Sequence, residues 1–325
     1  MESSASSLDV ISRDKLTIFE IFLHIGPEGE EILKTAKLVH VVDRWQAFVV
    51  TIADETYSFI RTPFVDSGVC KIAKIPQLFG VRIKDFVVVL IELAVTEDGS
   101  LYSWILHDPD VLDFDHDSTD FALLGRLKED ADGINWDKSD LILTPHRVLG
   151  SLTGKKVRQV ALSCERIVVL TMGGDVYEWG EAASSWEPCL VPKQHFQYQQ
   201  VISITCSDDM SAALTSNGEL FQWALDNKMP QKVVVDTAPF KKITATNDFI
   251  LALAVNGSLY SLGLQDSVVE WTAVYTCQEF QDIATSWTED AVIFELKNNT
   301  LCFAFCWNED SPPLTSFLPS CTSIE

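Results

Sequence analysis

A hairpin-like unit recurs along this chain at intervals of about forty residues, and no other feature constrains the fold as strongly. Each unit has an alternating apolar run, a short polar turn that often holds Gly, and a second run that ends in aromatic residues. The clearest copies are 93–104, 169–180 and 213–223, followed by 49–59 and 253–263. Alternation with a period of two around Asn-Gly or Asp-Gly predicts antiparallel β-hairpins.

Two weaker copies, 294–303 and 10–19, bring the number of units to seven. The position that holds Thr in the good copies falls at residues 11, 51, 96, 171, 215, 254 and 295. Another short apolar run precedes most hairpins, at 39–42, 160–164, 202–206, 243–246 and 283–286. The first hairpin has no such run before it, but a similar run, 318–323, follows the last hairpin.

These runs predict an all-β fold, a seven-bladed β-propeller that forms a single domain over residues 1–325. We expect the C-terminal strand to pair into the N-terminal blade and close the ring, because small sheets bury their faces only between neighbours. Two stacked β-sandwiches are the alternative all-β arrangement, but they do not explain the regular interval.

The hairpins resemble the repeat of the regulator of chromosome condensation (RCC1-like) family. The segment Ile204-Thr205-Cys206-Ser207-Asp208-Asp209-Met210-Ser211-Ala212-Ala213-Leu214-Thr215 is similar to the front half of that repeat. The segment Val176-Tyr177-Glu178-Trp179-Gly180 is similar to its back half. The family's Gly-Gln-Leu-Gly loop is absent from every copy, which indicates a divergent member. The resemblance implies a propeller fold and, from the founding member, guanine-nucleotide exchange on a small GTPase.

One interval is far longer than the others because it contains an insertion at about 106–146. Its residues 107–140 hold eleven acidic residues against Arg126, Lys128 and Lys138. The motif Asp113-x-Asp115-x-Asp117 begins like a calcium loop, but Ser118 and Leu124 stand where that loop needs Gly and Glu. We therefore expect an acidic loop that docks a basic protein rather than a metal site.

The aromatic residues fall into two groups. Those at the same place in every repeat are expected to pack between blades: Tyr57, Tyr102, Trp104, Tyr177, Trp179, Phe221, Trp223 and Tyr260. Trp136, Trp186, Trp271 and Trp287 lie outside the repeat pattern, and tryptophan is enriched at binding surfaces. The partner-binding residues predicted from the sequence are Asp108, Asp110, Asp113, Asp115, Asp117, Trp136, Trp186 and Trp271.

The formal net charge of −23, from 24 basic and 47 acidic residues, bears on the choice of partner. Such a chain is repelled by nucleic-acid phosphates and by anionic membranes, so we expect neither as a direct partner. A basic protein is favoured, although an acidic surface that serves only solubility is the plain alternative.

Nothing in the sequence predicts a catalytic residue, a cofactor or a metal, because it has no Gly-rich phosphate loop, nucleophile elbow or zinc-type spacing. The N-terminal residues lack the basic start and apolar core of a secretory signal, which favours the cytoplasm or the nucleus. We expect a non-catalytic scaffold or adaptor, a subunit of a larger complex. The alternative function is a guanine-nucleotide exchange factor for a small GTPase.

Overall fold

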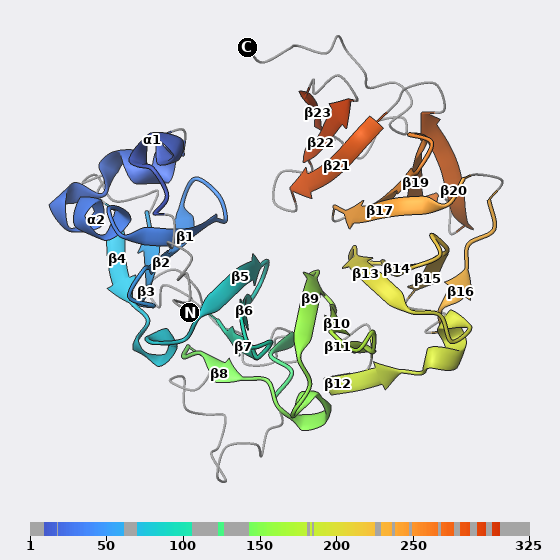
Figure 1. Ribbon diagram of the computed structural model, residues 1–325, viewed down its shortest axis with the longest axis horizontal. Coiled ribbons are helices and arrows are strands. Elements are labelled where there is room, and N and C mark those ends of the chain that lie inside the picture. The colour runs from blue at the N-terminus through green and yellow to red at the C-terminus, as the bar shows by residue number, and fades with distance from the viewer. Residues whose placement is uncertain are drawn as a thin grey trace, which may run out of the picture. The chain divides into compact units, whose positions relative to one another are not determined.

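The computed structural model describes the chain in segments separated by gaps. The described residues are 10–17, 19–61, 70–105, 123–126, 143–180, 183, 185–224, 229–235, 238–246, 249–265, 268–275, 280–286, 291–296 and 301–305. The chain divides into unit 1, residues 1–112 and 134–147, and unit 2, residues 113–133 and 148–325. Most of the described regular structure in both units is antiparallel β-sheet (Figure 1). The all-β prediction is therefore confirmed.

Unit 1 contains three short helices followed by two four-stranded sheets. The helices are α1 (Arg13–Leu16), η1 (Glu20–His24) and α2 (Gly26–Leu33). Sheet A consists of β1 (Ala36–Val41), β2 (Gln46–Thr51), β3 (Thr56–Ile60) and β4 (Lys71–Lys74). After the turn η2 (Pro76–Leu78), sheet B consists of β5 (Ile83–Val88), β6 (Glu92–Thr96), β7 (Leu101–Trp104) and β8 (His146–Arg147).

Unit 2 contains four further sheets, in which strands adjacent in sequence are also neighbours in the sheet. Sheet C follows η4 (Gly150–Leu152) and consists of β9 (Val157–Leu162), β10 (Ile167–Thr171), β11 (Val176–Gly180) and β12 (Ser185–Val191). Sheet D follows η5 (Lys193–Phe196) and consists of β13 (Val201–Cys206), β14 (Met210–Thr215), β15 (Leu220–Ala224) and β16 (Gln231–Lys232). Sheet E consists of β17 (Phe240–Ala245), β18 (Phe249–Ala254), β19 (Leu259–Gln265) and β20 (Val268–Tyr275). Sheet F has three described strands, β21 (Phe280–Ser286), β22 (Ala291–Leu296) and β23 (Leu301–Phe305).

The repeated threonine stabilises the hairpin turn that follows it. In sheet D the Oγ1 atom of Thr215 donates to the carbonyl oxygen of Glu219 at 3.2 Å and accepts from its amide at 3.2 Å. Thr96 and Thr171 make the same pair of bonds four residues on, and Thr51 accepts the equivalent amide. The hydroxyl thus pairs the amide at the end of the turn and adds a second bond to a carbonyl oxygen that already accepts from the threonine's own amide.

The first strand of every sheet carries a β-bulge at the same place. In sheet D, Val201 pairs with Thr215 and Ser203 with Leu214, so Ile202 is the extra residue. The equivalent extra residues in sheets A, B, C, E and F are Lys37, Lys84, Arg158, Lys241 and Gln281. A bulge adds local twist, which suits strands that must pack face to face with neighbouring twisted sheets.

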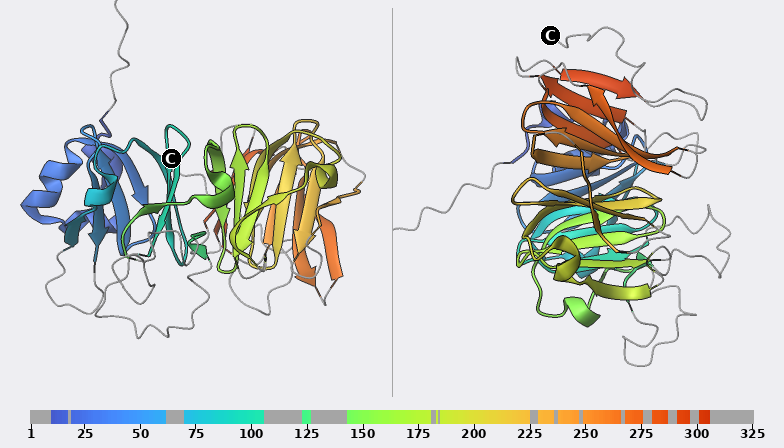
Figure 2. Two further views of the ribbon diagram at one scale, coloured as in Figure 1. Left: turned by 90° about the horizontal axis from the view of Figure 1, so that it is seen from below. Right: turned by 90° about the vertical axis from the view of Figure 1, so that its right-hand side faces the viewer.

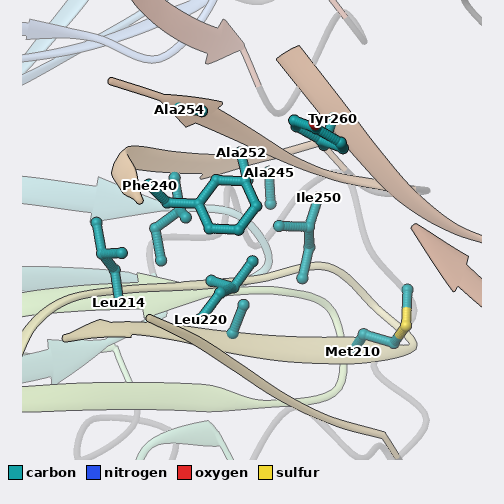
Figure 3. Packing of buried hydrophobic residues seen from close by; sticks show 11 residues of the cluster. Met210, Leu214, Leu220, Phe240, Ala245, Ile250, Ala252, Ala254 and Tyr260 are labelled. Atoms are coloured by element: carbon teal, nitrogen blue, oxygen red, sulfur yellow. The ribbon is translucent and has the colours of Figure 1, made fainter. Parts of the chain in front are cut away.

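Within each unit, apolar side chains fill the spaces between neighbouring sheets. Between sheets D and E, Leu214 and Leu220 pack against Phe240 and Ile250, and Tyr260 lies edge-on to Phe240 with ring centroids 5.6 Å apart (Figure 3). Comparable clusters lie between sheets C and D and between sheets A and B. Among the repeated aromatics the structure buries Tyr57, Trp104, Tyr177, Trp179, Phe221, Trp223 and Tyr260, whereas Tyr102 is half-buried. Their predicted role in packing is confirmed.

The hairpin predicted at 10–19 is wrong, because these residues begin a helical segment. Arg13 holds the segment together: its guanidinium donates to the carbonyl oxygen of Phe22 at 2.8 Å and to the carboxylate of Glu30 at 2.8 Å. Buried Leu16, Phe22 and other side chains of this segment pack against sheet A. The run 12–15 is polar and lacks the glycine of the best hairpin turns, and the bonds of Arg13 to Phe22 and Glu30 favour the helical segment instead.

Six sheets are present among the described residues, and the strand predicted at 318–323 lies outside them. The count of seven blades and the closure of the ring are therefore not confirmed. No helix in the described part of the chain is long and apolar enough to cross a membrane.

Candidate protein-interaction site

The predicted partner-binding residues fall into three groups. Asp108, Asp110, Asp113, Asp115, Asp117 and Trp136 lie outside the described residues. Trp271 lies in β20, where it pairs with Leu262 of β19. Trp186 lies in β12, the outermost strand of sheet C, and 47% of its surface is exposed.

A short segment of the insertion, residues 123–126, is described by the structure and packs onto sheet C within unit 2. We call residues 123–126 the anchor. Leu123, Leu124 and Arg126 are all buried. The indole nitrogen of Trp179 in β11 donates to the carbonyl oxygen of Leu123 at 2.9 Å. Trp179, the repeat aromatic of sheet C, therefore binds the anchor in addition to packing within the sheet.

Two glycines permit this close approach. Gly125 has φ +63°, and a Cβ atom on it would lie 2.7 Å from the indole nitrogen of Trp179. Gly180, at the end of β11, has φ +114°, and its Cβ would lie 2.4 Å from the carbonyl oxygen of Glu165 and 3.1 Å from Leu123 Cδ2. Only glycine combines such backbone angles with the absence of a side chain in this space.

A buried polar cluster lies next to Trp179, between sheets C and D. The carboxylate of Glu178 accepts from the indole nitrogen of Trp223 at 3.0 Å and from the hydroxyl of Ser211 at 3.3 Å. Arg166 lies 3.5 Å from Glu178 and donates to Ser211 at 3.1 Å and to the carbonyl oxygen of Asp209 at 3.1 Å. Glu178 and Arg166 neutralise each other, so the cluster fixes the two sheets together rather than offering a reactive group.

Arg126 brings a second buried cation to the anchor. Burial lowers the pKa of Arg126 to about 10. That value is still well above neutral pH, so the guanidinium stays protonated in the folded chain. A buried positive charge at the anchor is electrostatically suited to an insertion that carries eleven carboxylates between residues 107 and 140.

Trp186 lies at the same end of sheet C as the anchor. Ser185, the residue before Trp186, pairs with Gly180 of β11. A Cβ atom added to Gly180 would lie 3.1 Å from Leu123 Cδ2, so this end of the sheet adjoins the anchor. Further along β12, Pro188 interrupts the donors of this edge strand, and its carbonyl oxygen accepts from the hydroxyl of Ser151. The structure thus places the anchor and a half-exposed tryptophan at the same end of sheet C in unit 2.

The sequence did not reveal two features of these surfaces. The first is the anchor, whose only sequence signal is the apolar Leu123-Leu124-Gly125 inside a very acidic stretch. The second is in unit 1, where Arg44 and Arg61 lie over the ring of Trp45, at 4.9 Å and 5.5 Å from its centroid. Trp45 follows the first strand of its sheet, a position that the hairpin repeat does not include.

Part of the chain is similar in sequence to a known protein. Protein pim1 of Schizosaccharomyces pombe is 28% identical over 142 residues. The match covers 40% of this chain and 24% of pim1, so it reaches only about a quarter of that protein's length. No family model matches the chain.

Solved structures match over much more of the chain. Human WBSCR16 has a TM-score of 0.53 at 16% identity and covers 76% of this chain and 70% of its own. Prp20p of Saccharomyces cerevisiae, described with its binding to Gsp1p and histones, has a TM-score of 0.55 at 17% identity over 79% of this chain and 67% of its own. Yeast RCC1 (Prp20) in complex with Kap60 has a TM-score of 0.56 at 15% identity over 85% of this chain and 71% of its own.

These matches agree with the resemblance that the hairpin repeats indicated. At such identities the shared property is the arrangement of the sheets, while partners and activity belong to each protein separately. The chain is a divergent protein of the RCC1-like β-propeller fold.

Proposed function

We propose that this chain is a non-catalytic interaction scaffold, a subunit of a cytosolic or nuclear complex. One observation supports the proposal: the anchor, residues 123–126 of the insertion, packs on sheet C at the same end as the half-exposed Trp186. A partner with a basic surface and an apolar pocket would meet carboxylates and an aromatic side chain together. Such a pairing of charge steering with an aromatic contact is typical of protein interfaces.

The residues proposed for this contact are those expected from the sequence. Asp108, Asp110, Asp113, Asp115 and Asp117 would steer a basic partner, and Trp186 would supply apolar contact. Trp136 and Trp271 are proposed as further contacts. The binding of Prp20p to histones, which are basic proteins, supports a basic partner for an acidic chain of this fold.

The test is affinity purification of the tagged chain from native cells, with mass spectrometry of stoichiometric partners. The informative variant replaces the five aspartates 108, 110, 113, 115 and 117 with Asn, which removes charge and leaves the anchor intact. We expect a stoichiometric basic partner to be lost from this variant and from Trp186→Ala. A chain that recovers no stoichiometric partner, or the same partners after both changes, would rule the scaffold role out.

Guanine-nucleotide exchange is the second candidate, because the fold is shared with Prp20p, which was studied for its binding to Gsp1p. The acidic insertion would then displace phosphate and magnesium from a bound GTPase. Release of fluorescent GDP from a panel of small GTPases tests this directly. Release at the rate of the uncatalysed controls throughout the panel would exclude it.

The seven-bladed ring also stays a proposal. Residues 318–323 would supply a strand, but the seventh sheet would have to form without a hairpin at 10–19. Direct binding to nucleic acid or membranes is not proposed, since the net charge of −23 opposes both.

A further inference from the structure

Unit 2 has an edge whose charge is opposite to that of the insertion. The hairpin turns 171–175, 215–219 and 254–258 lie at this edge, together with the starts of β9, β13 and β17. We call it the turn edge. The anchor lies at the opposite end of sheet C, because Trp179 pairs with Ile167, far from the turn at 171–175.

Backbone hydrogen bonds tie each turn to the strand start of its own sheet, and one of them joins sheets D and E. In each sheet, the backbone amide just after the turn threonine, or after Ala254 in sheet E, donates to a carbonyl oxygen just before the first strand. These bonds join Met172 to Lys156 at 2.7 Å, Ser216 to Gln200 at 2.9 Å and Val255 to Pro239 at 2.8 Å. Neighbouring sheets also interlock there, since the amide of Phe240 in sheet E donates to the carbonyl oxygen of Gly218 in sheet D at 2.9 Å. Figure 2 shows these sheets side by side with their turns aligned.

Basic side chains gather at the turn edge. All six lysines that the structure describes in unit 2 lie there, with Arg158: Lys155, Lys156, Lys193, Lys232, Lys241 and Lys242. The described carboxylates that pair with these lysines are Asp175, Glu219 and, at the start of sheet F, Asp282, which lies 2.5 Å from Lys242. In a chain with a net charge of −23, this edge is a local positive surface.

The ion pairs at the turn edge leave the lysines accessible. Asp175 accepts from Lys193 at 2.8 Å and lies 3.5 Å from Lys155, and Glu219 pairs with Lys232 at 2.7 Å. The side chains of these three lysines are between 37% and 52% exposed. Exposed pairs of this kind contribute little to stability, so the lysines can exchange them for the carboxylates of a partner.

Exposed apolar side chains lie among these lysines. Met172 and Val255 stand in the turns of sheets C and E, and Val234 follows β16; each exposes more than half of its surface. Tyr198 follows η5 and is 79% exposed. Interfaces combine such apolar contacts with a charged rim, whereas an isolated exposed residue carries no such meaning.

Tyr198 is also held in a strained backbone conformation. Gln197 and Tyr198 have φ +53° and +58°, so two successive residues with side chains occupy the left-handed region. The amide of Tyr198 donates to the carbonyl oxygen of Lys193 at 3.0 Å, which fixes the tyrosine beside a lysine of the edge. Asn tolerates this conformation better than Tyr does. A bulky residue kept here at a cost in stability is a sign of function.

We propose that the turn edge of unit 2 binds an acidic protein segment in which carboxylates alternate with apolar side chains. The lysines would pair with its carboxylates, and Met172, Tyr198 and Val255 would contact its apolar side chains. A nucleic acid fits less well, because aliphatic Met and Val offer no stacking surface for bases. This site is separate from the insertion and would bind a partner of the opposite charge.

The test uses a fluorescein-labelled synthetic peptide in which Glu alternates with Leu and Phe, with anisotropy as the readout for the full chain. We expect saturable binding that weakens by about tenfold or more for Lys156→Glu combined with Lys193→Glu, as reversal of two contacting charges should cause. The control is Lys15→Glu combined with Lys71→Glu, an equal change of charge on exposed residues of unit 1, which should leave binding unchanged.

Tyr198→Asn separates binding from folding. We expect the variant to bind the peptide at least about threefold more weakly while its urea midpoint rises, because Asn relieves the left-handed strain. Weaker binding with a lower midpoint would instead show a structural role and overturn the functional reading of Tyr198.

Other outcomes also decide the question. Equal loss of binding in the control pair, tighter binding of a basic peptide or of single-stranded DNA, or saturation only through self-association would each overturn the proposal. The variant with five Asn residues in the insertion should retain peptide binding. Failure of the insertion site and failure of the turn edge are therefore distinguishable.

Discussion

Gly125 packs so closely against the indole of Trp179 that there is no space for a Cβ atom. Gly125→Ala would place a Cβ 2.7 Å from the indole nitrogen and hold alanine at φ +63°. We expect the free energy of unfolding, measured in urea, to fall by about 2–4 kcal/mol from strain and overpacking together. Gly154→Ala is the matched control, because Gly154 has φ +74° but no atom within 4 Å of its Cβ position. The control should lose only about 1 kcal/mol, and equal losses would show that the anchor is not packed as described.

Two buried tryptophans allow a comparison of the polar cluster with ordinary packing. Trp223→Phe removes the indole donor to the Glu178 carboxylate and should lower the free energy of unfolding by about 2–3 kcal/mol. Trp104 is equally buried, but its indole nitrogen has no hydrogen-bond partner among the described residues. Trp104→Phe should therefore cost about 1 kcal/mol less than Trp223→Phe in the same urea assay. The reverse order would contradict a stabilising role for the Glu178 bond.

His40 makes the stability of unit 1 depend on pH. Its ring lies 6.0 Å from that of Phe86, and burial lowers the pKa of His40 below 6.5, although the Asp85 carboxylate acts in the opposite direction. The unfolded chain then binds the proton more readily than the folded chain, so stability is complete above 6.5 and declines as the pH falls below it. Urea midpoints between about pH 5 and about pH 8 should slope less for His40→Gln than for the natural chain. Identical slopes would show that His40 does not contribute.

For single residues, the sequence predicted the burial of the repeated aromatics better than it predicted the interaction site. Trp179 and Trp223 could be assigned to the core because the repeat fixes their place. Their second roles, as donors to Leu123 and to Glu178, depend on which residue faces them across the fold, and the alternation of a strand does not specify that. Trp186 lies outside the repeat and is half-exposed, but its position beside the anchor could not be predicted, because that depends on the strand pairing of β11 with β12.

The hairpin turns show how an element depends on one hydroxyl. Thr215→Val keeps the shape of the side chain but removes both bonds to Glu219, which should lower the free energy of unfolding by about 1–2 kcal/mol. Sheet E has Ala254 at the equivalent position, and its turn relies on the Asn256 side chain bonding to Ser258. Ala254→Thr should therefore be neutral or stabilise by up to about 1 kcal/mol in the same assay. A strong loss in Ala254→Thr would mean that sheet E does not share the turn geometry.

All hairpins with Gly in the predicted turn formed, and so did the hairpins at 49–59 and 294–303, which have no Gly there. Gly99, Gly174, Gly218 and Gly257 all have positive φ in the turns where the pattern required it. At 10–19 the same alternation of apolar residues was present without such a turn, and a helix formed. The bulge that all six first strands share was not predicted, although its extra residue is Lys or Arg in four of the six strands.

Charge is distributed unevenly over the chain as a whole. The net charge of −23 favoured a basic partner, yet the lysines described in unit 2 gather at the turn edge. A count of residues cannot reveal this separation, because it arises from which ends of the strands meet in space. The two proposed sites would therefore bind partners of opposite charge.

Hydrogen–deuterium exchange tests the scaffold account most directly, with the chain compared alone and in complex with the partner that purification recovers. The account predicts slower exchange over residues 106–126 and 183–187, which hold the proposed contact residues, and unchanged exchange in the turns at 171–175 and 254–258. Protection confined to other segments, with none over the insertion or β12, would contradict the proposed interaction site.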